Sequence, residues 1–544
     1  MALTISFVLG LGIVATLALV IRRVIQNQTS PLRNIPGPTS GSLLKGKCRN
    51  VHRLMSPRNE KWKQELVERY GPVARLRGPF ATIWLHVYDP KALYNIAIKD
   101  QDIWSKNAIG ASSLLLGPGL LTTEGPQHRK QRKMLTPVFS AAYLRNVTTP
   151  FYETSYKLRD ALLKILGSET KEVDILKWTG RTALELLGQG ALGHSFDPLV
   201  EDVTDPFAEA VKSFFGATNA LGVARTIFGP FVLIGPAWLR RRVVELIPNA
   251  KVQTLKKIVD IMYQRSTDIV NEKKAAMEKG DDAVLRQVSE GNDIMSILLR
   301  ANTTASEKEK LSDDELIAQV STFILAGMDT TSNATSRLLH LLAMHPDVQE
   351  KLRNEILDAQ AGQEVSYDQI MDLPYLDAVT RETLRLCGPV GKISRVARQD
   401  TVLPLHEPIR GTDGKLITEL HVPKGTVAVI NGWACNTNKA LWGEDAYEWK
   451  PERWLSPLPR ALEEARIPGV YSNLMSFYGG GRGCIGFKYA QLELKVVLSV
   501  LLANFKFELT DKEIVWNQAG VAFPSVGKSR KPEMPLKVSA IGTL

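Results

Sequence analysis

Residues 477–486 read FYGGGRGCIG and stand directly before a segment with a helical pattern, Phe487–Ala503. Five of these ten residues are glycine, and Cys484 is one of only four cysteines in the chain. A cysteine at the N-terminus of a helix has its pKa lowered by the helix dipole and by nearby backbone N–H groups. Glycines leave space for those N–H groups to approach the sulfur. The stretch therefore predicts an anionic thiolate, which is a metal ligand.

The same glycines also match the fingerprint of a dinucleotide-binding turn, Gly481-x-Gly483-x-x-Gly486, and Glu508 lies 22 residues after the last glycine. Such a turn must follow a buried apolar strand within a βαβ unit. Residues 470–478, VYSNLMSFY, are not such a strand, and no Gly-Lys-Ser/Thr follows to make a phosphate loop. A nucleotide-binding dehydrogenase therefore ranks last among the hypotheses. A thiolate ligand for haem iron is preferred, with Arg482 as the cation for a haem propionate.

The composition sets broad limits on the class of protein. The chain has 544 residues, of which 44% are hydrophobic and 23% charged, which excludes a disordered tail, a collagen and a small disulfide scaffold. At roughly 150 residues per domain, the length alone suggests several domains. The net charge of +11 indicates an acidic partner, which could be nucleic acid, an anionic membrane surface or an acidic protein. The cysteines form no C-x-x-C pair, so a disulfide framework is not expected.

The N-terminus has the pattern of a membrane anchor. Residues 4–21, TISFVLGLGIVATLALVI, carry no charge and are followed by Arg22 and Arg23. As a helix this run is about 27 Å long, enough for a thin bilayer. We therefore expect a transmembrane signal anchor over residues 1–23 with the body in the cytosol. A proline-rich hinge over 24–40, which contains NIPGP, should orient the body, residues 41–544, against the membrane.

The body shows mostly helical patterns. Short strand-like pieces occur near Thr82–Tyr88 and Thr426–Ile430, and the C-terminal tail has turn-rich segments with β character. A second apolar stretch, Ile227–Leu239, is interrupted by Gly-Pro pairs and cannot span a bilayer as one helix. It is either buried core or, the interpretation we favour, a surface loop that dips into lipid.

A long helix is expected after Ser312, which forms a capping box with Glu315, and it should continue to Pro346. Its middle, residues 326–333 (AGMDTTSN), contains mostly poor helix formers. Two interpretations stay open. The segment is a surface bend, or Gly327 makes room for a ligand at which Asp329 and Thr330 are aimed, with the helix distorted there.

Taken together, these motifs resemble those of the cytochrome P-450 monooxygenases. The pattern F-x-x-G-x-R-x-C-x-G resembles the haem loop of that family. Three other family motifs precede it, in the chain order that the family shows. The motif residues are Phe477, Gly480, Arg482, Cys484 and Gly486 in the loop, Ala326-Gly327-x-Asp329-Thr330-Thr331, Glu382-x-x-Arg385, and Pro451-Glu452-Arg453-Trp454. The resemblance implies a single large fold, mainly α with minor β sheets, behind the N-terminal anchor.

The resemblance also implies the roles of individual residues. Cys484 would be the axial thiolate ligand of haem b iron, and Asp329 and Thr330 would handle protons for oxygen activation. Glu382, Arg385 and Arg453 would form a buried structural ion network. Further haem-binding residues would be Phe477, Arg482, His128, Arg132 and Arg395. His128 departs from the pattern, because many relatives carry tryptophan there.

The implied function is a monooxygenase of the endoplasmic reticulum membrane that uses O2 and electrons from an NADPH-cytochrome reductase. Arg129, Lys130 and Lys133 would steer the acidic reductase to the protein. The substrate is expected to be a lipophilic small molecule, and the fungal style of the haem loop favours a terpenoid or other secondary metabolite over a sterol or fatty acid. The alternatives are a haem-thiolate isomerase or dehydratase, and a haem sensor or steroid-binding protein. No role for nucleic acid is expected.

Overall fold

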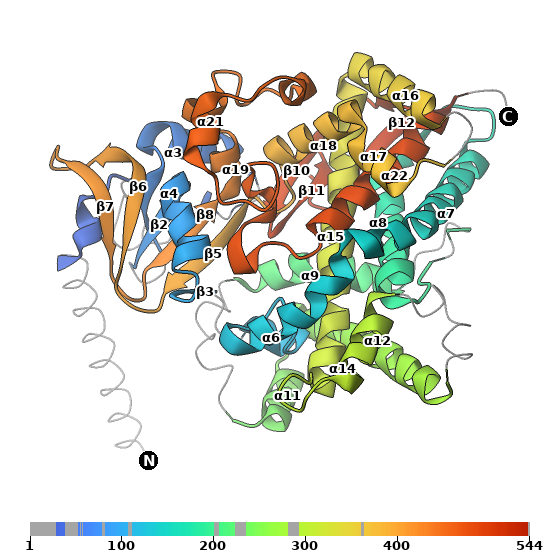
Figure 1. Cartoon of the computed structure of the whole chain (residues 1–544), viewed down its shortest axis with the longest axis horizontal. Helices are drawn as coiled ribbons and strands as arrows, with labels where there is room; N and C mark the ends of the chain where they lie inside the picture. The colour runs from blue at the N-terminus through green and yellow to red at the C-terminus, as the bar shows by residue number, and fades with distance from the viewer. Residues whose placement is uncertain are drawn as a thin grey trace. The chain divides into compact units, whose positions relative to one another are not determined.

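The computed structural model describes residues 29–38, 53–54, 56, 58–78, 82–106, 111–197, 199–200, 206–222, 235–280, 293–360 and 364–541 (Figure 1). The contacts divide the chain into two compact units. Each unit draws on three segments that are far apart in the sequence. The first consists of Met1–Asn107, Lys392–Leu441 and Arg460–Arg482, and the second of Ala108–Gly391, Trp442–Pro459 and Gly483–Leu544.

The first unit is built on a five-stranded sheet with the strand order β1-β2-β8-β5-β3. These strands are β1 (Val73–Arg77), β2 (Ile83–Val87), β3 (Trp104–Lys106), β5 (Lys392–Ala397) and β8 (Val427–Asn431). All neighbouring strands are antiparallel except β2 and β8, which are parallel. Every residue of the central strand β8, VAVIN, is buried, as expected for a strand covered on both faces. The predicted strands near 82–88 and 426–430 are confirmed.

The remaining elements of the first unit are short. Strands β6 (Thr401–Arg410) and β7 (Leu416–Val422) form a separate antiparallel pair. The helices are α3 (Glu60–Tyr70), α4 (Pro90–Tyr94), α19 (Gly432–Asn436) and α21 (Arg460–Ala465), and the single turns are η1 (Pro31–Asn34), η3 (Asn95–Lys99), η9 (Met475–Phe477) and η10 (Gly480–Arg482). Helix α20 (Lys439–Trp442) begins in the first unit and ends in the second.

The described part of the predicted hinge, residues 29–38, packs against this unit. The carbonyl of Pro36 accepts the backbone N–H of Arg75 at 2.8 Å, and the carbonyl of Asn34 accepts that of Thr412 at 2.8 Å. Gly37 is required here, because a Cβ at this position would lie 2.0 Å from the carbonyl oxygen of Arg75. The segment is therefore fixed by hydrogen bonds to β1 and to the turn between β6 and β7.

The second unit is mainly helical. Its long central helix α15 (Asp313–Met344) packs against α8, α12 and α22 (Figure 1). The other helices are α5 (Ala111–Leu116), α6 (Gly125–Leu135), α7 (Ala141–Leu166), α8 (Ile175–Leu187), α9 (Pro206–Ala220), α11 (Ala237–Leu246), α12 (Ala250–Glu278), α14 (Ile294–Thr304), α16 (Pro346–Gln360), α17 (Tyr367–Asp372), α18 (Pro374–Cys387) and α22 (Phe487–Asn504). Single turns are η4 (Thr136–Phe139), η5 (Gly188–Leu192) and η8 (Pro451–Leu455).

Two small sheets complete the second unit. One has the order β4-β12-β9, with β4 (Lys171–Asp174), β9 (Phe505–Leu509) and β12 (Pro535–Ala540). The other pairs β10 (Ile514–Ala519) with β11 (Val521–Val526). The predicted β character of the C-terminal tail and the mainly helical fold with small sheets are thus confirmed.

The membrane predictions fall largely on residues that the structure does not describe. The apolar run 4–21 and residues 24–28 and 39–40 of the hinge lie outside the described residues, as do residues 227–234 of the second apolar stretch. Among the helices of the described ranges, none is long and apolar enough to cross a membrane. The end of the second apolar stretch, from residue 237 to 239, lies in α11.

Candidate active site

Backbone contacts in the first unit shape the glycine-rich loop before Cys484. A Cβ on Gly479 would lie 1.7 Å from the carbonyl oxygen of Pro468, and one on Gly480 would lie 1.9 Å from that of Ala97. Gly480 also has a positive φ of 63°, which favours glycine. These two glycines therefore serve close packing of the loop on backbone, a reason that the sequence alone did not reveal.

Cys484 lies two residues before the N-cap of α22, Gly486, and its side chain is exposed. The desolvation of the thiol by the surrounding protein raises its pKa, while a hydrogen bond from the N–H of Gly486 and the charge of Arg132 lower it. Desolvation therefore opposes the thiolate form, whereas the N–H of Gly486 and the cation of Arg132 favour it. A glycine N–H, as predicted, and a cation thus lie beside the sulfur of Cys484.

Helix α6 carries two further predicted cofactor residues of the second unit, besides Cys484. Arg132 donates a hydrogen bond from Nη1 to the carbonyl of Gly483 at 2.7 Å, directly beside Cys484. His128 lies one turn earlier on α6 and is buried. The structure thus places Arg132 beside Cys484, in agreement with a position near the predicted haem ligand.

The predicted cofactor residues of the first unit lie around two tyrosines. The guanidinium of Arg395, on β5, lies over the ring of Tyr478 at 5.0 Å, and the ring of Phe477 meets that of Tyr471 edge to face at 5.6 Å. Burial raises the pKa of Tyr478, and the charges of Arg395 and Arg482 oppose this rise. Tyr478 therefore brings the two predicted arginines together within this unit. The sequence pattern did not single out either tyrosine.

Helix α15 is continuous through its poor helix formers. The hydroxyl of Thr330 donates to the carbonyl of Ala326 at 2.6 Å, and Nδ2 of Asn333 donates to the carbonyl of Asp329 at 2.7 Å. Such bonds to the preceding turn let these side chains stay within a helix. The poor helix formers therefore do not interrupt α15, which runs unbroken from Asp313 to Met344. Ala326 itself is exposed, although the neighbouring residues 320–325 are buried.

Gly327 has a different role from the one suggested by its sequence context. A Cβ on this residue would lie 2.8 Å from Cδ1 of Leu187, on α8. The space left by the missing side chain is therefore filled by α8, and it is not room for a ligand.

Asp329 is held in an environment that favours its protonated form. Burial raises its pKa to about 6, although the charge of Lys212 and a hydrogen bond from Asn333 lower it. Nδ2 of Asn333 lies 3.1 Å from Oδ1 of Asp329. Lys212 comes from α9 and crosses α8 so closely that a Cβ on Gly180 would lie 2.3 Å from its Nζ. Lys212 was missed in the sequence, because no local pattern connects it with Asp329. Asn333 was missed as well, although it lies one helical turn after Asp329, a spacing that could have revealed the contact.

Aromatic packing connects α15 with the start of α22. The ring of Phe139 lies edge to face with those of Phe323, on α15, and Tyr489, on α22, at 6.1 and 6.3 Å. A Cβ on Gly486 would also be in ordinary contact with Phe139, at 3.6 Å. The cysteine segment of the second unit is therefore packed against the helix that carries Asp329 and Thr330.

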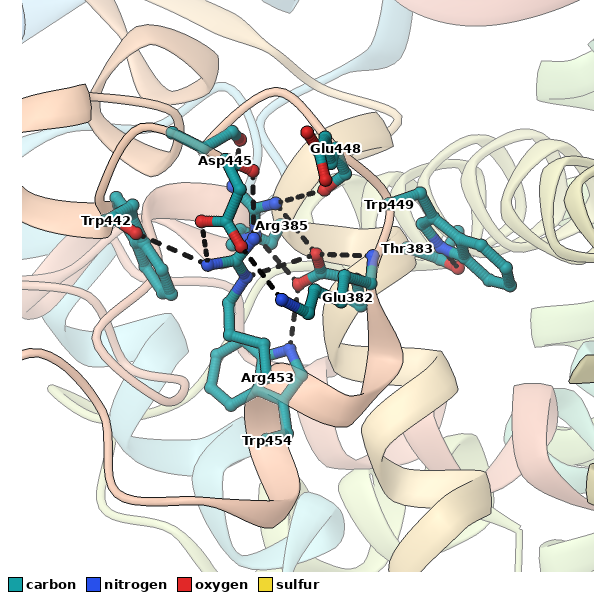
Figure 2. A network of polar contacts seen from close by, with 11 residues as sticks. Glu382, Thr383, Arg385, Trp442, Asp445, Glu448, Trp449, Arg453 and Trp454 are labelled. Carbon is teal, nitrogen blue, oxygen red and sulfur yellow. Dashed lines mark hydrogen bonds and ion pairs between the residues drawn. The ribbon is translucent and has the colours of Figure 1, made fainter.

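Glu382 and Arg385, both fully buried on α18, form the centre of a polar network (Figure 2). Nε and Nη2 of Arg385 donate to the two carboxylate oxygens of Glu382, each at 2.8 Å. Nε of Arg453 approaches Oε1 of Glu382 at 3.4 Å, and Nη1 of Arg453 donates to Asp445 at 2.8 Å. The structure therefore brings the three predicted residues together, in a doubly hydrogen-bonded ion pair with a second arginine.

The network reaches further along the chain than the sequence motifs. Glu382 also accepts the indole N–H of Trp454 at 2.9 Å and the backbone N–H of Lys450 at 3.0 Å. Arg385 donates to the carbonyls of Ala446 and Glu448 at 2.6 and 3.0 Å (Figure 2). Asp445 and these carbonyls carry no motif signal. Trp454 follows Arg453 in the PERW segment and was quoted only as part of that motif.

Residues 36–531 match the sequence profile described as "Cytochrome P450". The chain belongs to the cytochrome P450 family. It is 51% identical to cytochrome P450 monooxygenase 91 of Postia placenta over 538 residues, and this aligned length covers 98% of each protein. It is also 51% identical over 521 residues to a ganoderic acid synthetase of Ganoderma lucidum, with 94% of each protein covered.

Membership of the cytochrome P450 family identifies the chain as a monooxygenase and implies haem-thiolate iron, O2, a reductase partner and a small-molecule substrate. The donor set of the structure fits this cofactor. Cys484 offers one exposed sulfur, which accepts a hydrogen bond from the N–H of Gly486 and has the cation of Arg132 close by. Such outer hydrogen bonds and charges are typical of a thiolate that ligates iron.

Proposed function

We propose that this cytochrome P450 oxidises a lipophilic small molecule of secondary metabolism, with a terpenoid as the favoured substrate class. The observation that carries the catalytic part is the exposed Cys484 thiol, with the Gly486 N–H and Arg132 beside it, in a chain of this family. The substrate class is supported by a similarity of 51% identity to a protein named ganoderic acid synthetase. A sterol or fatty acid is the alternative substrate.

Haem b, when bound, would supply oxygen activation and its insertion into a C–H bond. Cys484 would supply the thiolate ligand of the iron. Phe477, Arg482, Arg395 and His128 would hold the macrocycle and its carboxylates, and Arg132 would bind the haem on the side of the Cys484 sulfur. The protein thus contributes the ligand, the counter-charges and the orientation of the substrate.

Asp329 and Thr330 would deliver protons during turnover. A carboxyl with a pKa of about 6 exchanges a proton readily near neutral pH, which is the property required of a general acid and base. The hydroxyl of Thr330 lies one residue further along α15 and is held by the carbonyl of Ala326. We infer that Asp329 takes up protons and that the Thr330 hydroxyl orients their transfer.

We infer that the body is bound to the endoplasmic reticulum by a single anchor over residues 1–23 and faces the cytosol behind the hinge 24–40, with residues 41–544 as the catalytic domain. A second membrane contact is supported by α11. In this helix, the side chains of Trp238 and Leu246 are 69% and 81% exposed. Arg240–Arg242 lie between them in the sequence of the same helix. Exposed apolar side chains next to arginines are typical of a helix that lies at lipid headgroups.

The proposed partner for electrons is an acidic NADPH-cytochrome reductase. Of the basic residues suggested for docking, Lys133 has a 74% exposed side chain but approaches Glu309 at 3.3 Å. Lys130 donates to the carbonyl of Lys310 at 2.9 Å and lies 3.5 Å from Glu315. Lys130 is therefore the weaker candidate, and we expect Arg129 and Lys133 to contribute most to steering.

Coexpression of the full chain with an NADPH-cytochrome reductase, followed by product profiling on terpenoid, sterol and fatty-acid substrates, tests this function. We expect NADPH-dependent O2 uptake and an oxygenated terpenoid, and Cys484→Ser should abolish both the product and the thiolate-type absorption of the reduced CO complex. A product formed without O2 or reductase would instead support a haem-thiolate isomerase or dehydratase. Binding of ligand without any product would support a sensor or steroid-binding protein.

A further inference from the structure

Gln131, directly before Arg132 on α6, is fully buried, and its side-chain amide is completely hydrogen bonded. Its Nε2 donates to the carbonyl of Pro118 at 2.8 Å and to Oε1 of Glu315 at 2.9 Å. Its Oε1 accepts the hydroxyl hydrogen of Thr123 at 2.9 Å. Since an amide has two N–H donors and one oxygen, all of these groups have a partner. Gln131 therefore fixes α6 both to the loop before it and to α15.

Glu315, the partner of Gln131, is itself held from several sides. Its Oε2 accepts the backbone N–H of Ser312 at 2.9 Å, as part of the capping box at the start of α15. Its Oε1 also accepts Nε2 of Gln127 at 3.1 Å. Burial raises the pKa of Glu315, but these hydrogen bonds outweigh it and hold the carboxyl ionised. A buried carboxylate with this many donors has a defined orientation, so it is a rigid anchor for Gln131.

The bond between Gln131 and Glu315 also determines where the side chain of Arg132 lies. Consecutive side chains on a helix project roughly 100° apart, so fixing the side chain of Gln131 also fixes the direction in which that of Arg132 leaves α6. The guanidinium of Arg132 ends on the carbonyl of Gly483 at 2.7 Å, one residue before Cys484. A buried network of this kind is not needed to pack two helices, since apolar side chains of the same shape would do so equally well.

We propose that Gln131 and Glu315 are positioning residues that hold the guanidinium of Arg132 on the carbonyl of Gly483 and so keep a cation beside the Cys484 sulfur. The inference rests on the proposed function, in which Cys484 ligates haem iron. A nearby positive charge stabilises the more electron-rich, reduced state of such a centre. The network therefore raises the midpoint potential of the iron and slows the loss of its thiolate ligand.

The test uses the purified, haem-containing full chain and a double-mutant cycle of Gln131→Leu, Arg132→Met and the double variant. Three properties are measured: the midpoint potential, the rate at which the reduced CO complex loses its thiolate-type absorption, and the thermal midpoint. We expect Gln131→Leu to lower the potential and to speed the spectral loss by about tenfold, the factor that corresponds to one net hydrogen bond. In the Arg132→Met background, Gln131→Leu should change neither property further, while the thermal midpoint still falls.

Gln127→Leu is the matched control. Gln127 lies one turn earlier on α6, is exposed, and donates to the same oxygen of Glu315. Its replacement leaves the bonds of Gln131 in place, so it should change the potential and the spectral loss much less than Gln131→Leu does. Thr123→Val removes the bond to Oε1 of Gln131 together with the local bond to the carbonyl of Gly119, and leaves both bonds of Gln131 Nε2 in place. It should lower the potential by a smaller amount, which keeps the test decisive if Gln131→Leu does not fold.

Two results would overturn the inference. An effect of Gln131→Leu on the potential that is equally large with and without Arg132 would show a general structural role. An unchanged potential in Arg132→Met would show that the cation does not act on the sulfur. A wild-type protein without thiolate-type absorption would instead overturn the proposed function itself, so the two failures are distinguishable.

Discussion

At the scale of single residues, Asp329 couples stability to pH. Burial raises its pKa from 3.8 to about 6, so the folded protein binds this proton more tightly than the unfolded chain does. The stabilisation is fully present below pH about 4 and is lost as the pH rises through about 6. The shift corresponds to about 3 kcal/mol, and partial exposure reduces it to about 2 kcal/mol.

Asp329→Asn should therefore raise the free energy of unfolding by about 2 kcal/mol at pH 8 and leave it nearly unchanged at about pH 4. Chemical denaturation at the two pH values measures this, and turnover should fall by at least about tenfold because the proton donor is lost. The matched control is Asp313→Asn at the start of α15, where the side chain is 73% exposed. Equal stabilisation at both pH values would contradict the prediction.

Lys212 provides a second prediction at this scale. Its positive charge lowers the pKa of Asp329, so Lys212→Gln should move that pKa above about 6. We expect the acid limb of the pH profile of turnover to shift upward, with little change in substrate affinity. Lys177→Gln, which removes a cation from α8 that does not act on Asp329, serves as the control. A pH profile that is the same in wild type and Lys212→Gln would exclude a role for this lysine in proton delivery.

At the scale of the elements, the glycine-rich loop offers a matched pair of substitutions. A Cβ on Gly479 would meet the backbone carbonyl of Pro468 at 1.7 Å, whereas one on Gly481 would meet the flexible end of Gln101 at 2.5 Å. Backbone cannot move aside as a side chain can. Gly479→Ala should therefore destabilise the protein by about 3 kcal/mol or more and deplete bound haem, while Gly481→Ala should cost about 1 kcal/mol. Thermal unfolding and haem content measure both, and equal effects would contradict the packing argument.

The elements also show how far the sequence predicts this protein. The capping box of α15 and the cysteine before α22 are local patterns, because the residues that interact lie within one turn of each other. The role of Gly327 depends on Leu187, from another helix, and the hydrogen bond of Gln131 to Glu315 spans 184 positions. Single-sequence periodicity contains no information about such contacts. The motif residues were therefore predictable, and the residues that hold them in place were not.

At the scale of the whole molecule, the chain leaves and re-enters each compact unit. The short segment Trp442–Pro459 belongs to the second unit, although the segments on either side of it, Lys392–Leu441 and Arg460–Arg482, belong to the first. Such a segment needs strong local contacts in order to stay with its unit. The arginine and carboxylate network supplies them, because Glu382 and Arg385 on α18 bind Arg453, Trp454 and the carbonyls around residue 446 (Figure 2).

The segment should therefore detach when the network is broken. Glu382→Gln removes the charge that balances two buried arginines, and leaving a buried charge unpaired costs about 3 to 5 kcal/mol. We expect a correspondingly lower stability in denaturant and faster proteolysis within residues 442–459. Glu452→Gln is the matched control, because this neighbouring carboxylate is 45% exposed and pairs with Lys351 and the Tyr375 hydroxyl. Its loss should cost less than about 1 kcal/mol. If both variants were equally stable, the buried network would not be what holds this segment in the second unit.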